Sequence, residues 1–87
     1  EELVAALPGC ELDVAARLAE QLRQRVGRLR IEGISPAEAD SATLSLSIGV
    51  ARLRPGETLE SLVRRADAAM YAAKRAGRDR VEVDRAE

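Results

Sequence analysis

Large aromatic side chains are almost absent from this sequence. It contains neither Phe nor Trp, and Tyr71 is its only aromatic residue. A hydrophobic core must therefore be built from Leu, Val, Ile and Ala, and a planar ligand could stack only on Tyr71. A chain of 87 residues buries roughly 60–70% of its extended-chain surface, so this core is expected to be thin.

Cysteine, excess charge and long apolar runs are also scarce, and each absence excludes a class of protein. The single Cys10 cannot form an internal disulfide, which fits a reducing compartment and leads us to expect a cytoplasmic location. The 14 basic and 15 acidic residues leave no excess of positive charge for a general nucleic-acid surface. The longest apolar run, residues 3–7, is far shorter than the about 20 residues that span a bilayer. We therefore expect no nucleic-acid partner and no membrane contact from this segment.

Two stretches have the periodicity of amphipathic helices. The first is predicted over residues 11–29, and Gly27 is a point at which it could end or fray. The second is predicted to begin after Thr58 as N-cap and to end at Gly77, a glycine placed to adopt a left-handed conformation just past the last turn. The predicted apolar stripes are Ala15, Leu18, Leu22, Val26 and Leu29 on the first helix, and Leu59, Leu62, Val63, Ala66, Ala69, Met70 and Ala73 on the second.

Residues 43–53 alternate in the manner of a strand, with Leu44, Leu46, Ile48 and Val50 on one face and Thr43, Ser45, Ser47, Gly49 and Ala51 on the other. The small residues would let a helix approach closely. Shorter strands are expected at 3–7 and 80–84, and residues 30–42 are interpreted as a loop, with a short strand at 29–31 as an option. The order strand–helix–strand–helix–strand predicts an α+β fold with helices on one side of a sheet.

Three segments carry a family resemblance: residues 45–50 (SLSIGV), 65–71 (RADAAMY) and 73–78 (AKRAGR). In order and spacing they resemble the closing half of a GGDEF domain, the diguanylate cyclase family, which condenses two GTP into cyclic di-GMP and pyrophosphate. The resemblance implies that residues 1–87 are the C-terminal portion of one GGDEF domain with a palm-like fold and a mainly antiparallel sheet. A chain that opens on Glu1 rather than Met is also expected to come from something longer.

Lys74 and Arg78 are the candidate substrate-binding residues. Cations near a helix C-terminus offset the helix dipole and need no ligand, so spacing alone favours a structural reading. In the family that the chain resembles, however, the Lys and Arg of this Lys-x-x-x-Arg pattern contact the GTP phosphates. The resemblance therefore favours phosphate binding by Lys74 and Arg78.

Glu1 and Glu2 carry no signal by composition, since two terminal glutamates are usually a solvated chain end. The resemblance aligns them with the third and fourth letters of the family signature, which implies that both are catalytic acids. Glu1 would bind the divalent metal, Mg²⁺ or Mn²⁺, because hard cations prefer carboxylate oxygens and neutralise phosphate charge. The signature glycines are missing here, and Leu3 stands where the family usually has Phe.

Other conspicuous residues have simpler readings. Asp67 is interpreted as a surface carboxylate paired with a nearby Arg, and Tyr71 as a packing residue rather than a base platform. Gln21 aligns with a family Arg that takes part in product inhibition, with Arg23 nearby. The four arginines of the first helix and its end are interpreted as a solvated surface: Arg23, Arg25, Arg28 and Arg30.

The leading functional hypothesis is thus one half of a diguanylate cyclase domain that binds GTP and works as a homodimer. By itself the chain is expected to be inactive, and its uncovered strand edges are expected to favour self-association. The alternative is a degenerate, non-catalytic GGDEF module that binds nucleotide or a protein partner. A third hypothesis is an unrelated α+β interaction domain.

Overall fold

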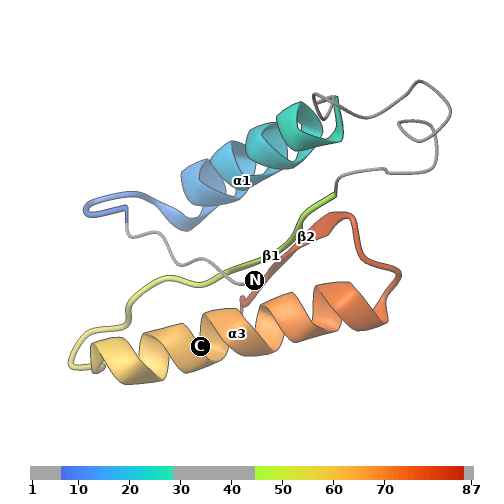
Figure 1. Ribbon diagram of the computed structural model, residues 1–87. Helices are drawn as coiled ribbons and strands as arrows, with labels where there is room; N and C mark the ends of the chain where they lie inside the picture. The colour runs from blue at the N-terminus through green and yellow to red at the C-terminus, as the bar shows by residue number, and fades with distance from the viewer. Residues whose placement is uncertain (1–6, 29–44, 86–87) are drawn as a thin grey trace, which may run out of the picture.

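The computed structural model describes residues 7–28 and 45–85. Within them, two helices and two short strands follow in the order α1 (Leu12–Gly27), β1 (Ser47–Val50), α3 (Leu59–Arg75) and β2 (Arg80–Val83) (Figure 1). Both predicted helices are confirmed, and α1 ends at Gly27. Apart from Leu7, the strands expected at 3–7 and 29–31 lie outside the described residues.

The two strands pair in parallel, with Ser47 opposite Arg80 and Val50 opposite Val83. The expectation of a mainly antiparallel sheet is not confirmed by this pair, which is the one sheet among residues 7–28 and 45–85. The reason lies in the connection. Helix α3 runs back along the strands, so the chain re-enters the sheet at the end where β1 began, and a strand reached by such a crossover is parallel to its predecessor.

Helices α1 and α3 lie on opposite sides of the strands, so the expectation of helices on one side only is wrong (Figure 1). The small-residue face of β1 was predicted to let a helix approach closely, and this is confirmed at Gly49. A Cβ atom built there would overlap the carbonyl oxygen of Ala66 and the amide nitrogen of Met70. Helix α3 therefore lies directly on the glycine, and the opposite face of β1, with its larger apolar side chains, is left for α1.

Helix α1 faces the strands with a row of residues that overlaps only in part with the predicted stripe. Ala15 and Val26 are half-buried, as predicted, whereas Leu18 is 46% exposed and Leu22 is 53% exposed. The half-buried residues of α1 are Leu12, Ala15, Ala16, Ala19, Glu20, Arg23 and Val26. A period of 3.6 residues shows that a helix has an apolar side, but two adjacent rows fit that period equally well here.

The centre of the structure lies under α3, where Ala69 and Ala73 are the buried residues of the described part of the chain. The N-cap prediction is confirmed, because the hydroxyl of Thr58 accepts a hydrogen bond from the amide of Ser61 at 3.1 Å. Neither described helix has the length and apolarity that a bilayer-spanning segment requires.

Tyr71 does not pack in the core: its side chain is 61% exposed, so the packing prediction for this residue is wrong. Two positions along a helix correspond to a rotation of about 200°, which places Tyr71 opposite the buried Ala69 and Ala73. Its ring instead lies under the guanidinium of Arg75, at 5.8 Å from carbon to ring centroid.

Candidate phosphate-binding site

The C-terminal end of α3 is closed by a Schellman motif, which fixes the backbone between Lys74 and Arg78. Ala76 is the C-cap, and Gly77 follows with φ at +120°. The amide of Arg78 donates to the carbonyl of Ala73 at 2.9 Å, and the amide of Gly77 donates to the carbonyl of Lys74 at 3.5 Å. The predicted role of Gly77 is therefore confirmed, and both candidate cations are held at one end of one helix.

Beyond Gly77 the backbone remains in the left-handed region for two more residues, Arg78 at φ +62° and Asp79 at φ +45°. Residues with a Cβ adopt this region at a cost of about 1–2 kcal/mol each. The turn is held from the far side by Arg80, whose amide donates to the carbonyl of Leu46 at 3.2 Å and whose Nε donates to the carbonyl of Arg78 at 3.3 Å. Strained backbone that persists at a candidate site supports a functional reading of that site.

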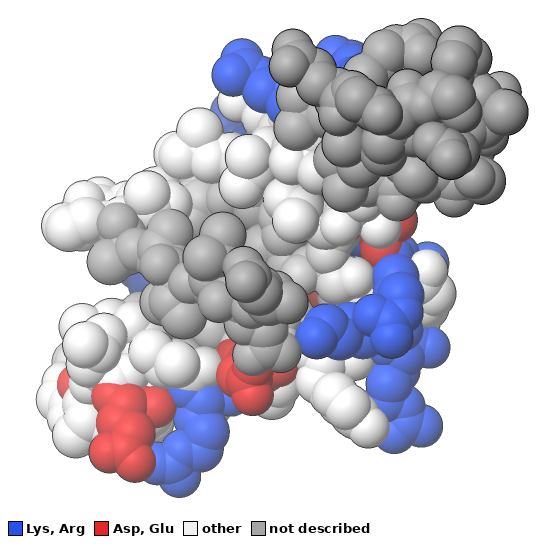
Figure 2. All heavy atoms as spheres, in the orientation of Figure 1, with Lys and Arg blue, Asp and Glu red and all other residues white. Residues whose placement is uncertain are grey.

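Positive charge gathers at this end of the molecule. Lys74 and Arg75 occupy the last turn of α3, and Arg78 and Arg80 follow within five residues. In Figure 2 a continuous group of Lys and Arg atoms is visible on this side. Arg78 is exposed, and no carboxylate of the described residues pairs with its guanidinium. Four cations outweigh the one carboxylate of Asp79 and the roughly half negative charge of a helix C-terminus, so this end can attract a polyanion.

A residue that the sequence analysis assigned to the solvated surface is part of this region. Arg23 is only 22% exposed and links α1 to the turn after α3, because its Nη1 lies 2.9 Å from Oδ1 of Asp79. Its Nε and Nη2 donate to the two carboxylate oxygens of Glu20 at 2.8 and 2.6 Å. These bonds, with a further one from Gln24, lower the pKa of Glu20 to about 2. The sequence signal was the position of Arg23 in line with Ala16 and Ala19, on the side of α1 that is half-buried.

A second ion-pair network, centred on Arg65, was also missed. Its Nε donates to Glu57 at 2.7 Å, its Nη1 to Asp84 at 2.8 Å and its Nη2 to the carbonyl of Arg52 at 2.6 Å. Glu57 is only 8% exposed, and the hydrogen bonds from Arg65 hold its pKa far below the ordinary value of 4.5. This network joins the turn before α3 to the end of β2. Arg65 is only 16% exposed and donates to partners within the network, so we interpret the network as structural.

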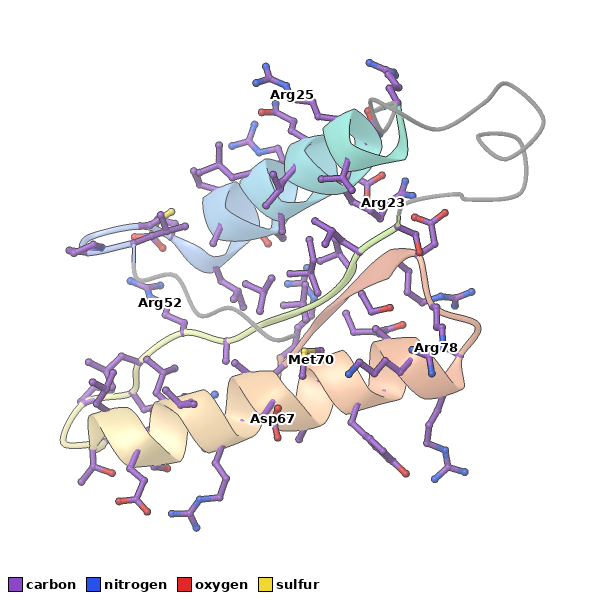
Figure 3. All side chains as sticks on the ribbon, viewed as in Figure 1. Arg23, Arg25, Arg52, Asp67, Met70 and Arg78 are labelled. Atoms are coloured by element: carbon purple, nitrogen blue, oxygen red, sulfur yellow. The ribbon has the colours of Figure 1, made fainter. Side chains whose placement is uncertain are left out.

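Asp67 lies on the exposed side of α3, as predicted (Figure 3). The predicted pairing with an Arg is not seen within the described part of the chain, since its neighbour Arg65 is turned the other way, toward Glu57 and Asp84.

An open groove of about 300 Å³ runs between α3 and β2, away from Lys74 and Arg78. Its lining combines alanines with charged side chains: Arg65, Ala68, Ala69, Ala72, Glu82, Val83 and Asp84. Two carboxylates beside an arginine that is already paired do not suit a phosphate. The basic end of α3 remains the better candidate.

The predicted catalytic acids Glu1 and Glu2 lie outside the described residues. Glu1 was also the predicted metal ligand. Within residues 7–28 and 45–85, no group of three acidic, His or Cys side chains is arranged to hold a metal ion. The described part of the chain therefore contains the predicted phosphate-binding cations but not the predicted metal site.

Comparisons with known proteins identify relatives of this chain. The family model described as "Diguanylate cyclase, GGDEF domain" matches residues 1–80. Among curated proteins, diguanylate cyclase DgcM of Escherichia coli is 40% identical over 93% of this chain, and DgcP of Pseudomonas aeruginosa is 35% identical over 95%. The chain spans 18% and 12% of those two proteins, respectively.

A solved structure matches as well. The GGDEF domain of DgcB from Caulobacter crescentus, in complex with c-di-GMP, superimposes with a TM-score of 0.81 at 35% identity, over 92% of this chain and 45% of that one. The parallel strand pair, the helix lying on Gly49 and the basic turn after α3 thus occur in a chain whose sequence and fold both match one family. The chain belongs to the GGDEF family of diguanylate cyclase domains.

Proposed function

We propose that this chain forms the phosphate-binding half of a domain that condenses two GTP molecules into cyclic di-GMP and pyrophosphate. The observation that carries the proposal is the joint placement of Lys74 and Arg78 at the closed end of α3, in a chain of the GGDEF family. In this proposal the two side chains bind the triphosphate of GTP. Family membership alone would also fit a module that has lost catalysis, so the site requires a test of its own.

The two cations suit complementary parts of the task. The planar guanidinium of Arg78 can bind two phosphate oxygens at once, whereas the ammonium of Lys74 acts as a compact point charge. Phosphoryl transfer leaves negative charge on the departing pyrophosphate, and donors already held in place stabilise that charge without reorganisation. The Schellman motif supplies this rigidity for the backbone of Arg78.

The remaining parts of the proposal rest on residues and molecules outside the described structure. We assign Glu1 as a ligand for Mg²⁺ or Mn²⁺ and Glu2 as a second acid of the same site. The bound ion would neutralise phosphate charge. Each subunit of a homodimer would bring one GTP, since the product joins two. The 87-residue chain alone is expected to make no cyclic di-GMP when incubated with GTP and Mg²⁺.

The test replaces both cations, Lys74→Ala and Arg78→Ala, in the intact polypeptide that carries this sequence. Removal of one preorganised charge-stabilising donor typically lowers kcat by about 10²–10³-fold, so the double variant should lose at least about 10²-fold in cyclic di-GMP formation. GTP affinity, measured by titration calorimetry with Mg²⁺, should fall as well. Arg64→Ala is the matched control, because Arg64 is an α3 arginine that is 74% exposed and pairs only with Glu60 among the described residues.

Each outcome decides a different point. Unchanged turnover and unchanged GTP affinity in the double variant would reject phosphate binding at this end of α3. If the unmodified protein binds GTP but forms no cyclic di-GMP, catalysis is rejected and the non-catalytic module replaces it.

A further inference from the structure

The side chain that holds the turn after α3 comes from the helix on the other side of the sheet. Arg23 Nη1 lies 2.9 Å from Oδ1 of Asp79, a contact between residues 56 positions apart. Figure 3 shows Arg23 on the side of α1 that faces the strands, whereas Arg25 points away from them. Asp79 is the residue directly after Arg78, and both are left-handed.

The orientation of Arg23 is itself fixed. Glu20, one turn earlier on α1, accepts from Nε and Nη2 and so takes one edge of the guanidinium, which leaves Nη1 for Asp79. Gln24 donates to the same Glu20 carboxylate at 3.0 Å. Three side chains of α1 thus cooperate to present one N–H group to the turn, an arrangement that a merely solvated surface does not need.

Asp79 brings a negative charge next to the arginine that must attract phosphate. Without a partner, its carboxylate would compete with the incoming anion for Arg78 and would repel that anion directly. In the structure this carboxylate accepts from Arg23 and is therefore turned toward α1.

We propose that Arg23 is a positioning residue for phosphate binding: by pairing with Asp79 it keeps that carboxylate away from Arg78. The inference rests on the proposed function, since it concerns the same site. It assigns Arg23 no contact with GTP itself.

The test compares four forms of the intact polypeptide: unmodified, Arg23→Gln, Asp79→Asn, and the double variant. The measurement is the Kd for GTP with Mg²⁺, by titration calorimetry. Arg23→Gln leaves the Asp79 carboxylate without its partner and should raise the Kd about three- to tenfold. This is the size expected for one unpaired charge near a partly exposed site. Asp79→Asn should bind GTP as tightly as the unmodified protein or more tightly, because an amide oxygen still accepts from Arg23 and Asn tolerates the left-handed region.

The double variant separates positioning from simple support of the fold. If the released charge causes the loss, Asp79→Asn should restore affinity in the Arg23→Gln background to within about twofold, although the ion pair is still missing. The difference in Kd between Arg23→Gln and the double variant should also shrink when salt rises from about 0.1 to about 1 M, because the screening length falls from about 10 to about 3 Å. A double variant that binds as poorly as Arg23→Gln, or a gap that salt does not change, overturns the inference.

Arg25→Gln is the matched control on the same helix, and it should leave the Kd unchanged. An Arg23→Gln protein with unchanged affinity, alongside a Lys74→Ala/Arg78→Ala protein with reduced affinity, would reject the inference and keep the proposed function. If the Lys74→Ala/Arg78→Ala protein also binds GTP with normal affinity, phosphate binding at this end of α3 is rejected, and the inference about Arg23 is rejected with it.

Discussion

Substitution of Gly49 by Ala tests the central packing contact of this fold. In β1, Ala would ordinarily stabilise a strand relative to Gly by roughly 0.5–1 kcal/mol, because Gly loses more conformational freedom on folding. The structure predicts the opposite sign. The added methyl group would overlap the carbonyl oxygen of Ala66 and the amide nitrogen of Met70, and it would lie 3.0 Å from the carbonyl carbon of Ala69.

All three neighbours are backbone atoms of one helix, so no side chain can rotate away. Helix α3 would have to retreat by roughly 1.5 Å to restore an ordinary separation of about 3.5 Å. That movement would open the contact that buries Ala69 and Ala73. Overpacked sites lose about 1–3 kcal/mol when side chains can adjust, and we expect about 3 kcal/mol here. A chain of 87 residues has about 4–13 kcal/mol of stability in total, so this loss is a large part of it.

The assay is urea unfolding of the intact polypeptide, followed by circular dichroism. With a slope of about 1–2 kcal/mol per M, the midpoint should fall by about 1.5–3 M. Gly27→Ala is the matched control, because a Cβ atom at Gly27 meets nothing within 4 Å and Ala is favoured over Gly in a helix by about 1 kcal/mol. A Gly49→Ala protein that unfolds at the same or a higher urea concentration than the unmodified protein would refute this account of how α3 lies on β1.

Two further predictions concern charged and aromatic side chains. Because the Glu57 pKa is lowered in the fold, the stabilisation from its contact with Arg65 should be complete above about pH 5 and should decline steadily as the pH falls below 4.5. Glu57→Gln should therefore lower the urea midpoint more at pH 7 than at pH 2, and a difference that is the same at both pH values would contradict this. Tyr71→Ala should lower the free energy of unfolding by less than about 1 kcal/mol, since the exposed ring contacts Arg75 at the surface. A loss of several kcal/mol would contradict this and indicate that Tyr71 packs in the core.

Much of the local structure of this protein followed from the sequence alone, because it depends on residues close together in the chain. Thr58 and Gly77 mark the two ends of α3 through hydrogen bonds that span three to five residues. The small residue at Gly49 predicted a close helix, and the order of motifs identified the family that the comparisons then showed. The prediction of Lys74 and Arg78 as phosphate-binding residues also depends on this order of motifs.

Only the tertiary structure decided which surfaces meet. The side of α1 that faces the strands could not be chosen from two adjacent apolar rows, so Arg23 was assigned to solvent and the leucines to the core. The pairing of Arg23 with Asp79 and of Arg65 with Asp84 joins residues 56 and 19 positions apart, respectively. The physical reason is that periodicity reports the average polarity of a helix face, whereas the contacts across a sheet depend on the direction in which the chain returns to it.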